Sequence, residues 1–219
     1  MKKLILLAGL AVVAGAANAD FVDDFEGANV WTTSEGPGFY VNPWVRETGS
    51  GNQQSGQNNW FFADLDNISD SYLDSPLLVA DLNTPALTFG RQYDLEADFD
   101  GVVVEVNVNG GGFVDIGPAN LVTNGYDGPI STFYQSPIGG RDAFNGFHMG
   151  YLTTTGNIQV SAGDTFILRF RGATDNSVSA FGFALDDVDV RGASVVPEPG
   201  TFVAIGIGLA GLALARRRK

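Results

Sequence analysis

The sequence has no cysteine and only one histidine in 219 residues. Without cysteine the chain forms no disulfide, has no thiol nucleophile and offers no thiolate ligand to a metal. A single histidine, His148, argues against zinc sites of the usual kind, which draw several ligands from histidine and cysteine. A Ser-His-Asp triad is not expected either, because no G-x-S-x-G sequence occurs. We therefore expect His148, between Phe147 and Met149, to be a strand residue with one satisfied hydrogen bond.

Lysine is almost as scarce, and the three lysines all lie at the chain ends: Lys2, Lys3 and Lys219. If both ends are targeting segments, the 177 residues between them carry six arginines and 24 carboxylates, a net charge of −18. Such a surface repels nucleic-acid phosphates and anionic headgroups, so no nucleic-acid partner is expected. It suits cations, or neutral polymers such as polysaccharide, although part of the acidic excess also serves solubility.

The N-terminal apolar run has the features of a secretory signal peptide. Residues 1–19 combine Lys2 and Lys3 with an apolar core and end in Ala17-Asn18-Ala19, a small-residue cleavage site. An uncleaved anchor helix is the alternative, but the apolar part is short. We expect cleavage before Asp20 and export of the chain.

The C-terminal run, residues 196–219, has three parts in a fixed order. Pro197-Glu198-Pro199 keeps the backbone extended, Thr201–Ala215 carries no charge, and three arginines with Lys219 close the chain. A helix over the uncharged part would be roughly 22 Å long, short of the ~30 Å hydrocarbon core but workable with snorkelling basic residues. A plain membrane anchor, a single C-terminal hydrophobic helix, is the simple interpretation.

The order of tripeptide, apolar span and basic end resembles the PEP-CTERM sorting tail of Gram-negative bacteria. The resemblance implies processing by an exosortase-type enzyme and delivery to the cell envelope, the outer surface or the exopolysaccharide matrix. It implies nothing about biochemical activity.

Residues 20–195 are expected to form one all-β domain. Valines 102, 104, 106 and 108 alternate with mostly polar residues, the glycines 110–112 predict a turn, and Phe113–Ile116 is the expected hairpin partner. Further strands are expected over Tyr93–Phe99, Phe166–Phe170 and Phe181–Val190. Short strands with Gly- and Asn-rich turns favour a two-sheet antiparallel jelly-roll sandwich.

Several segments, taken together, resemble the MAM-like or choice-of-anchor jelly-roll modules of extracellular bacterial proteins. They are Asp23–Gly27, Asp70–Leu77, Val102–Phe113, Gly139–Gly146, Phe166–Phe170 and Gly182–Val188. Each is weakly specific alone, and their order carries the resemblance. It implies the fold, but not the adhesion partners of disulfide-bearing relatives.

A structural calcium ion is the leading site hypothesis. In such a sandwich the first and last strands are expected to lie side by side, which would gather carboxylates from distant parts of the chain. The candidate ligands are Asp24, Glu26, Asp64, Asp66, Asp70, Asp186 and Asp187. The family resemblance implies Glu26, Asp70 and Asp187 most directly. The alternative is that all seven are solvated strand ends.

Carbohydrate binding is the alternative function. Sugars are held by aromatic stacking and by hydrogen bonds from amides and carboxylates. Trp44, Tyr126 and Tyr134 lie in or beside long polar connections and are the candidate glycan contacts, whereas Trp31 and Trp60 are expected in the core. A glycosidase is not expected, because none of the few glutamates lies in a recognisable catalytic setting.

The sequence therefore predicts an exported protein with a structural or adhesive role. Its expected location is the cell envelope or an exopolysaccharide matrix, for example the matrix of a biofilm. Its expected partners are an exosortase-type enzyme, extracellular polysaccharide and, before processing, the membrane through the C-terminal helix.

Overall fold

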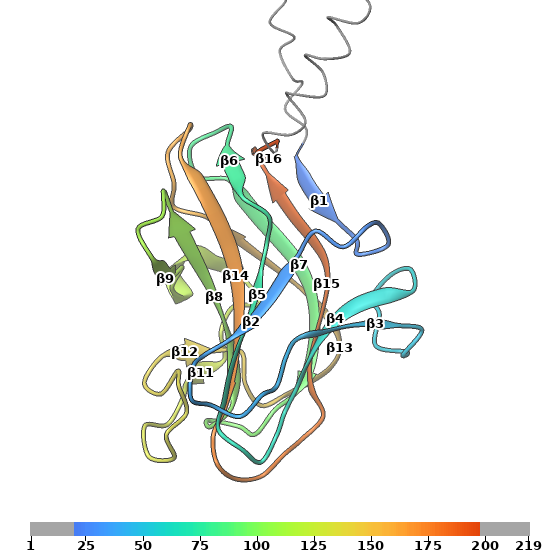
Figure 1. Cartoon of the computed structure of the whole chain (residues 1–219), viewed down its shortest axis with the longest axis vertical. Helices are drawn as coiled ribbons and strands as arrows, with labels where there is room; N and C mark the ends of the chain where they lie inside the picture. Colours follow the sequence, from blue (N-terminus) through green and yellow to red (C-terminus); the bar gives the residue numbers. More distant parts are fainter. Residues whose placement is uncertain (1–19, 198–219) are drawn as a thin grey trace, which may run out of the picture.

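A computed structural model describes residues 20–197 of the chain (Figure 1). The predicted signal peptide, Glu198, Pro199 and the apolar span with its basic end lie outside the described residues. Within residues 20–197, no helix is long and apolar enough to cross a membrane.

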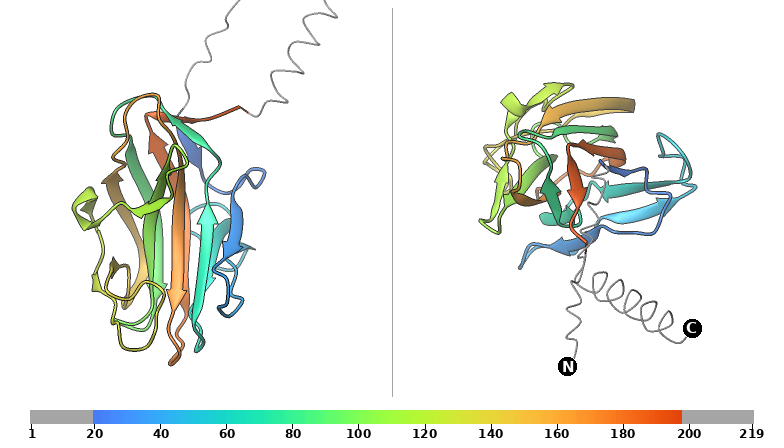
Figure 2. Two further views of the ribbon diagram at one scale, coloured as in Figure 1. Left: turned by 60° about the vertical axis from the view of Figure 1, so that its left-hand side comes forward. Right: turned by 90° about the horizontal axis from the view of Figure 1, so that it is seen from above.

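The described residues form two antiparallel sheets packed face to face, which confirms the predicted jelly-roll sandwich (Figures 1 and 2). In the first sheet the strand order is β10-β13-β7-β15-β4-β3, with β1 also paired to β15. Its strands are β1 (Phe21–Asp23), β3 (Val45–Thr48), β4 (Asn58–Ala63), β7 (Ala86–Asp94), β10 (Leu121–Thr123), β13 (Phe147–Asn157) and β15 (Gly182–Arg191).

In the second sheet, β14 is central and pairs with β8 on one side and with β5 and β6 on the other. Its strands are β2 (Thr32–Glu35), β5 (Ser69–Asp74), β6 (Leu78–Ala80), β8 (Gly101–Val108), β9 (Phe113–Asp115), β14 (Thr165–Thr174) and β16 (Ala193–Val195). A two-stranded unit, β11 (Gly128–Pro129) with β12 (Asp142–Ala143), and the short 3-10 helix η1 (Pro118–Asn120) complete the described elements.

Period-two alternation explains which residues form the core. On β8, Val102, Val104 and Val106 face the interior, as do Phe166 and Phe170 on β14. Burial of each large side chain contributes about 1.5–3 kcal/mol relative to exposure. The outer face of β8 is covered too, because Val103 is buried in a second small cluster with Ile130 and Ile138.

Two strand predictions have clear outcomes. The expectation that the first and last strands lie side by side is confirmed: β1 pairs with β15, and Phe21 lies opposite Val190. The strand expected over Tyr93–Phe99 is wrong at its C-terminal end, because β7 ends at Asp94 and the chain turns over residues 95–100. The amide of Leu95 donates to the carbonyl of Gly146 instead of continuing the ladder with β15.

The sandwich has two distinct ends. The proximal pole holds both described chain ends, since β1 leads in there and β16 leads out beside β6 (upper end of Figure 1). The distal pole, at the lower end of Figure 1, holds the turn over residues 95–100 and the β14–β15 loop over residues 175–181. The pairings of Ala63 and Asp94 with Gly182, and of Ala173 with Gly101, show that strands of both sheets end together at this pole.

Candidate metal centre

Four carboxylates meet at the distal pole, each within two residues of a strand end. Asp64 follows β4, Glu96 follows β7, Asp100 precedes β8, and Asp175 follows β14. Asp64 and Glu96 thus come from the first sheet, and Asp100 and Asp175 from the second. We call these four residues the cation centre.

The cation centre is compact. Glu96, Asp100 and Asp175 each place one carboxylate oxygen so that the three oxygens lie within 4.8 Å of one another. Backbone hydrogen bonds fix the group: the Glu96 amide donates to Asp64 Oδ2 at 2.9 Å, and the Asp175 amide donates to Asp100 Oδ1 at 2.6 Å. The relative exposure of Asp64 is 2%, and that of Asp100 and Asp175 is zero.

When all four carboxylates are ionised, each member of the centre has a buried oxygen without a hydrogen-bond partner. These atoms are Asp64 Oδ1, Glu96 Oε2, Asp100 Oδ2 and Asp175 Oδ2. None of the ion pairs among residues 20–197 involves these four side chains. An unpaired buried polar group costs about 1–3 kcal/mol, and more when it is charged. A positive charge between the four carboxylates would offset this cost.

The pKa values of these carboxylates also favour a bound cation. Burial, followed by the neighbouring Asp64, raises the pKa of Asp100 to about 10. Burial also raises the pKa of Asp64, and burial with the charge of Asp175 raises that of Glu96. Asp100 of the metal-free centre therefore retains its proton at neutral pH and donates it to the Asp64 carboxylate, because like charges out of water disfavour ionisation.

The donor set fits calcium. Ca²⁺ takes six to eight oxygen ligands at about 2.3–2.6 Å, so two ligands on opposite sides of one ion lie up to roughly 5 Å apart. The 4.8 Å limit on the three oxygen separations is compatible with this span. Mg²⁺ binds closer and more rigidly, and zinc prefers the histidine and cysteine ligands that are missing from this centre. Asp64, Glu96, Asp100 and Asp175 are the residues that would hold the ion.

The seven carboxylates predicted from the sequence do not form one cage. Asp64 belongs to the cation centre. Asp70 lies on the outer face of β5, where Arg171 Nε is 2.7 Å from its Oδ1. Period-two alternation requires this, since the neighbouring Ser71 and Leu73 cannot share that face. Asp66 is exposed and accepts a hydrogen bond from Asn67.

The carboxylates of Glu26, Asp186 and Asp187 bind a loop, residues 49–57, which joins β3 to β4. Asp186 Oδ2 accepts the amides of Gln54 and Ser55 at 2.8 and 3.1 Å, and Asp187 Oδ1 accepts the Ser55 hydroxyl at 2.8 Å.

Glu26 Oε1 accepts the amides of Gln57 and Asn58, both at 2.7 Å, and these bonds lower its pKa. Asp24, the remaining predicted ligand, accepts the Glu26 amide and so shapes the turn that presents Glu26. The structure therefore brings the ends of β1 and the middle of β15 to one loop, with backbone donors as partners of the carboxylates.

Sequence reasoning missed Glu96, Asp100 and Asp175. The sequence pattern predicts Glu96 as a strand residue, because the apolar alternation continues through Leu95, Ala97 and Phe99. The available signal was the acidic run Glu96–Asp100 directly before Gly101, a composition typical of turns.

Of the three candidate glycan contacts, Trp44 is buried and Tyr126 is half-buried against the core, which corrects the expectation that these two line a sugar platform. Trp44 is 2% exposed and packs on Phe62 with ring centres 5.5 Å apart. The Tyr126 hydroxyl accepts the amide of Val104 at 2.8 Å, and its ring contacts Phe144 inside the sandwich. Tyr134 is 48% exposed.

The other side chains whose places were predicted lie as expected. Trp31 and Trp60 are core residues, 3% and 4% exposed. His148 is on β13, and its Nε2 lies 3.0 Å from Asp127 Oδ1.

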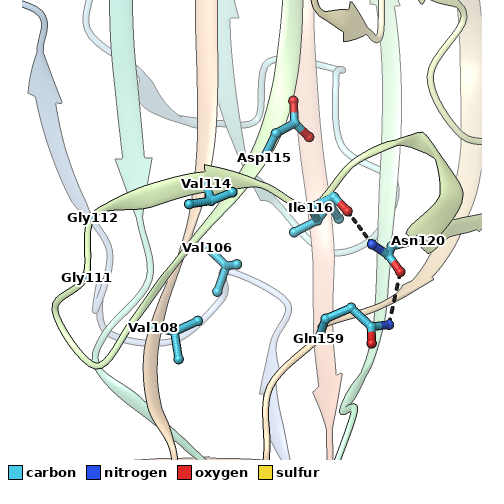
Figure 3. A pocket seen from close by; sticks show the side chains of 9 residues that line it. All are labelled: Val106, Val108, Gly111, Gly112, Val114, Asp115, Ile116, Asn120 and Gln159. Carbon is cyan, nitrogen blue, oxygen red and sulfur yellow. Dashed lines mark hydrogen bonds between the residues drawn. The ribbon is translucent and has the colours of Figure 1, made fainter.

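A hollow of about 350 Å³ opens at the edge of the sandwich beside the β8–β9 hairpin (Figure 3). Val106, Val108, Val114 and Ile116 form apolar walls, and the Gln159 amide donates to Asn120 Oδ1 at 3.0 Å on the opposite rim.

Of the nine residues that line this hollow, Asp115 alone is titratable, and it is ion-paired with Arg141 at 2.7 Å. The hollow therefore offers shape and a few amide groups, without a pair of groups suited to acid–base chemistry.

Among solved structures, the chain is similar to the K1 cleaved adhesin domain of Lys-gingipain from Porphyromonas gingivalis W83. The identity is 16%, over 80% of this chain and 98% of that one, with a TM-score of 0.46. It is also similar to the C-terminal family 22 carbohydrate-binding module of Clostridium thermocellum Xyn10B, at 12% identity over 83% and 99% of the two chains and a TM-score of 0.44. A family 35 carbohydrate-binding module from an environmental isolate matches at 14% identity over 77% and 99%, with a TM-score of 0.40. Likenesses of this size carry no argument about ligand or activity.

No curated protein matches the chain. The scan against family models matches residues 195–219 to the PEP-CTERM protein-sorting motif. This confirms the interpretation of the C-terminal segment that was made from its tripeptide, apolar span and basic end. The chain therefore carries a PEP-CTERM sorting motif, which indicates an exported, surface-sorted protein.

Proposed function

We propose that this protein is a structural or adhesive component of the cell envelope or exopolysaccharide, and that a calcium ion holds its jelly-roll together at the distal pole. The observation that carries the calcium part is the cluster of three buried aspartates with the half-buried Glu96, each of which has an unpaired oxygen. Because the centre joins strand ends of both sheets, the ion would act as a staple. Buried behind the turn over residues 95–100, it would serve stability and not turnover.

The proposed location of the protein is inferred from its C-terminal segment. Pro197-Glu198-Pro199 and the motif match support processing by an exosortase-type enzyme, with the apolar span held in the membrane beforehand and a Gram-negative envelope as the destination. Mass spectrometry of surface-released protein tests this: we expect material that ends near Pro199. Released protein that still ends in Lys219 would refute processing.

The calcium centre is tested directly by calorimetric titration of the full chain with CaCl₂ after removal of metal by EDTA. We expect one tight site for each chain. Asp175→Asn should weaken binding strongly, because it removes a fully buried ligand. Asp66→Asn is the matched control, since Asp66 is exposed and outside the centre. Equal binding by both variants would reject the assignment.

A dedicated carbohydrate-binding module is the second candidate function. One observation favours it: the exposed aromatic side chains of the described residues gather at one pole. Trp44 cannot contribute, because it is a core residue.

A further inference from the structure

Five phenylalanine and tyrosine side chains are exposed among residues 20–197, and all five lie at the distal pole. They are Phe39, Tyr40, Phe133, Tyr134 and Phe147, with relative exposures of 41%, 54%, 86%, 48% and 68%. The large apolar residues exposed at the proximal pole are aliphatic.

Three separate segments bring these rings to the pole. The amide of Tyr40 donates to the carbonyl of Ile68, which directly precedes β5. Phe133 and Tyr134 belong to the loop of residues 131–140, in the lower part of Figure 1. Phe147 begins β13 and lies opposite Asp94, the last residue of β7.

The rings are spaced and not merged into one apolar patch. Within the described chain, none of the five packs against another of the five, and Tyr134 rests on Phe99 at 5.3 Å between ring centres. Each ring therefore exposes its own surface to solvent, separately from the other four. Separate ring faces suit successive sugar units, which stack singly on aromatic side chains, better than they suit a continuous apolar protein interface.

Polar residues beside the rings offer hydrogen bonds, and the negative charge of the domain disfavours anionic ligands. Exposed Thr132 and Gln135 flank Phe133 and Tyr134, and His148 follows Phe147. Stacking combined with amide and hydroxyl donors is the usual chemistry of saccharide recognition. The strong net negative charge of the domain repels anionic polymers, so the fitting partner is a neutral polysaccharide.

The cation centre supports the same loops. Its members Glu96 and Asp100 flank the turn in which the carbonyl of Asp98 accepts the amide of Ser131, at 2.6 Å, at the start of the loop of residues 131–140. The ring of Phe99, which belongs to that turn, packs against the ring of Tyr134. An ion that fixes this turn would fix the ring-bearing loop as well.

We propose that the distal pole is a binding surface for a neutral polysaccharide, with its aromatic loops positioned by the cation centre. The cation dependence rests on the proposed calcium site. The described chain ends lie at the opposite pole, so a chain held through its tail presents this surface outward (Figure 2).

The test is affinity gel electrophoresis of the full chain in gels that contain dextran, soluble glucan, galactan or xylan, with alginate as the anionic comparison. We expect retardation by at least one neutral polymer, none by alginate, and weaker retardation in EDTA. The double variant Phe133→Ala, Tyr134→Ala should bind about ten-fold more weakly or worse, since two stacking contacts are lost. Both side chains are exposed, so the fold should persist. Val122→Ala is the control, because Val122 is 68% exposed and lies on β10, away from the pole.

Each outcome decides the proposal. Unchanged binding by the double variant, or retardation by none of the neutral polymers, overturns the saccharide surface. Calcium-dependent melting without polysaccharide binding leaves the calcium site standing and removes this inference. Ring-dependent binding that is indifferent to EDTA keeps the surface and rejects its coupling to the ion.

Discussion

Replacing Asp100 by asparagine is expected to change the stability of the protein in opposite directions with and without calcium. Asparagine has the shape of a protonated aspartate, and its Oδ1 can still accept the Asp175 amide that now lies 2.6 Å from Asp100 Oδ1. In EDTA the native Asp100 already holds a proton at neutral pH, because its pKa is raised to about 10. Asp100→Asn should therefore melt at the native temperature or slightly above it when metal is absent.

With calcium the order reverses. An ion present at 100 times its dissociation constant stabilises the folded state by about 2.7 kcal/mol. For a domain of this size each kcal/mol moves the melting temperature by roughly 2–4 °C, so the native shift is about 5–11 °C. If the variant loses about a hundred-fold in affinity, the same calcium concentration contributes only about 0.4 kcal/mol, and the shift falls to roughly 1–2 °C.

Circular dichroism melts of the full chain, in EDTA and in excess CaCl₂, measure both effects. Asp66→Asn should behave as the native chain in both conditions, because Asp66 is exposed and outside the cation centre. The reasoning is refuted if calcium does not move the native melting temperature, or if Asp100→Asn keeps the whole calcium shift.

Three further predictions concern pH and the loop of residues 49–57. Folding raises pKa values in the metal-free cation centre, so the folded chain keeps protons that the unfolded chain releases above pH ~4. The free energy of unfolding in EDTA should therefore fall as pH rises from there, by about 1.4 kcal/mol per pH unit for each retained proton, and the melting temperature should fall with it; excess calcium should flatten this slope. Asp186→Ala removes the acceptor of the Gln54 and Ser55 amides; because both residues are exposed, water can replace the carboxylate, and the expected loss is about 0.5–1.5 kcal/mol. Hydrogen exchange at these two amides should become faster, and unchanged exchange would contradict the loop contacts. Gly56→Ala should destabilise by about 1–3 kcal/mol in urea unfolding, because Gly56 has a φ of 57° and a Cβ there would overlap the Glu26 carboxylate; Gly27→Ala, with open space around it, should cost much less.

Much of the sandwich could be predicted because the tendency to form a strand depends on the pattern of neighbouring residues. The alternation over Val102–Val108 and Phe166–Phe170 depends only on neighbours in sequence, and both segments are strands with the expected faces buried. The glycines after Val108 mark the hairpin turn for the same reason: Asn109 and Gly110 take positive φ, a conformation that glycine and asparagine tolerate best.

The end of β7 could not be predicted in this way. Leu95 and Phe99 continue the apolar pattern, which reports the side on which a residue is buried but not whether its backbone pairs. The strand ends because the Leu95 amide donates a hydrogen bond to the carbonyl of Gly146, 51 positions later in the chain. The backbone then turns at Asp98, which has a φ of 69°. Contacts between distant segments decided this boundary, and with it the place of Glu96.

The sorting of the protein could be inferred from residue order alone, because a sorting tail is recognised as a linear order of tripeptide, apolar span and basic end. It also determined the sheet-forming character of the domain, through alternation between adjacent residues. Which of the many carboxylates meet depends on the folded arrangement, since Asp64 and Asp175 are far apart in the chain and approach each other because strands of two sheets end at the same pole. The gathering of the exposed rings at that pole has the same cause.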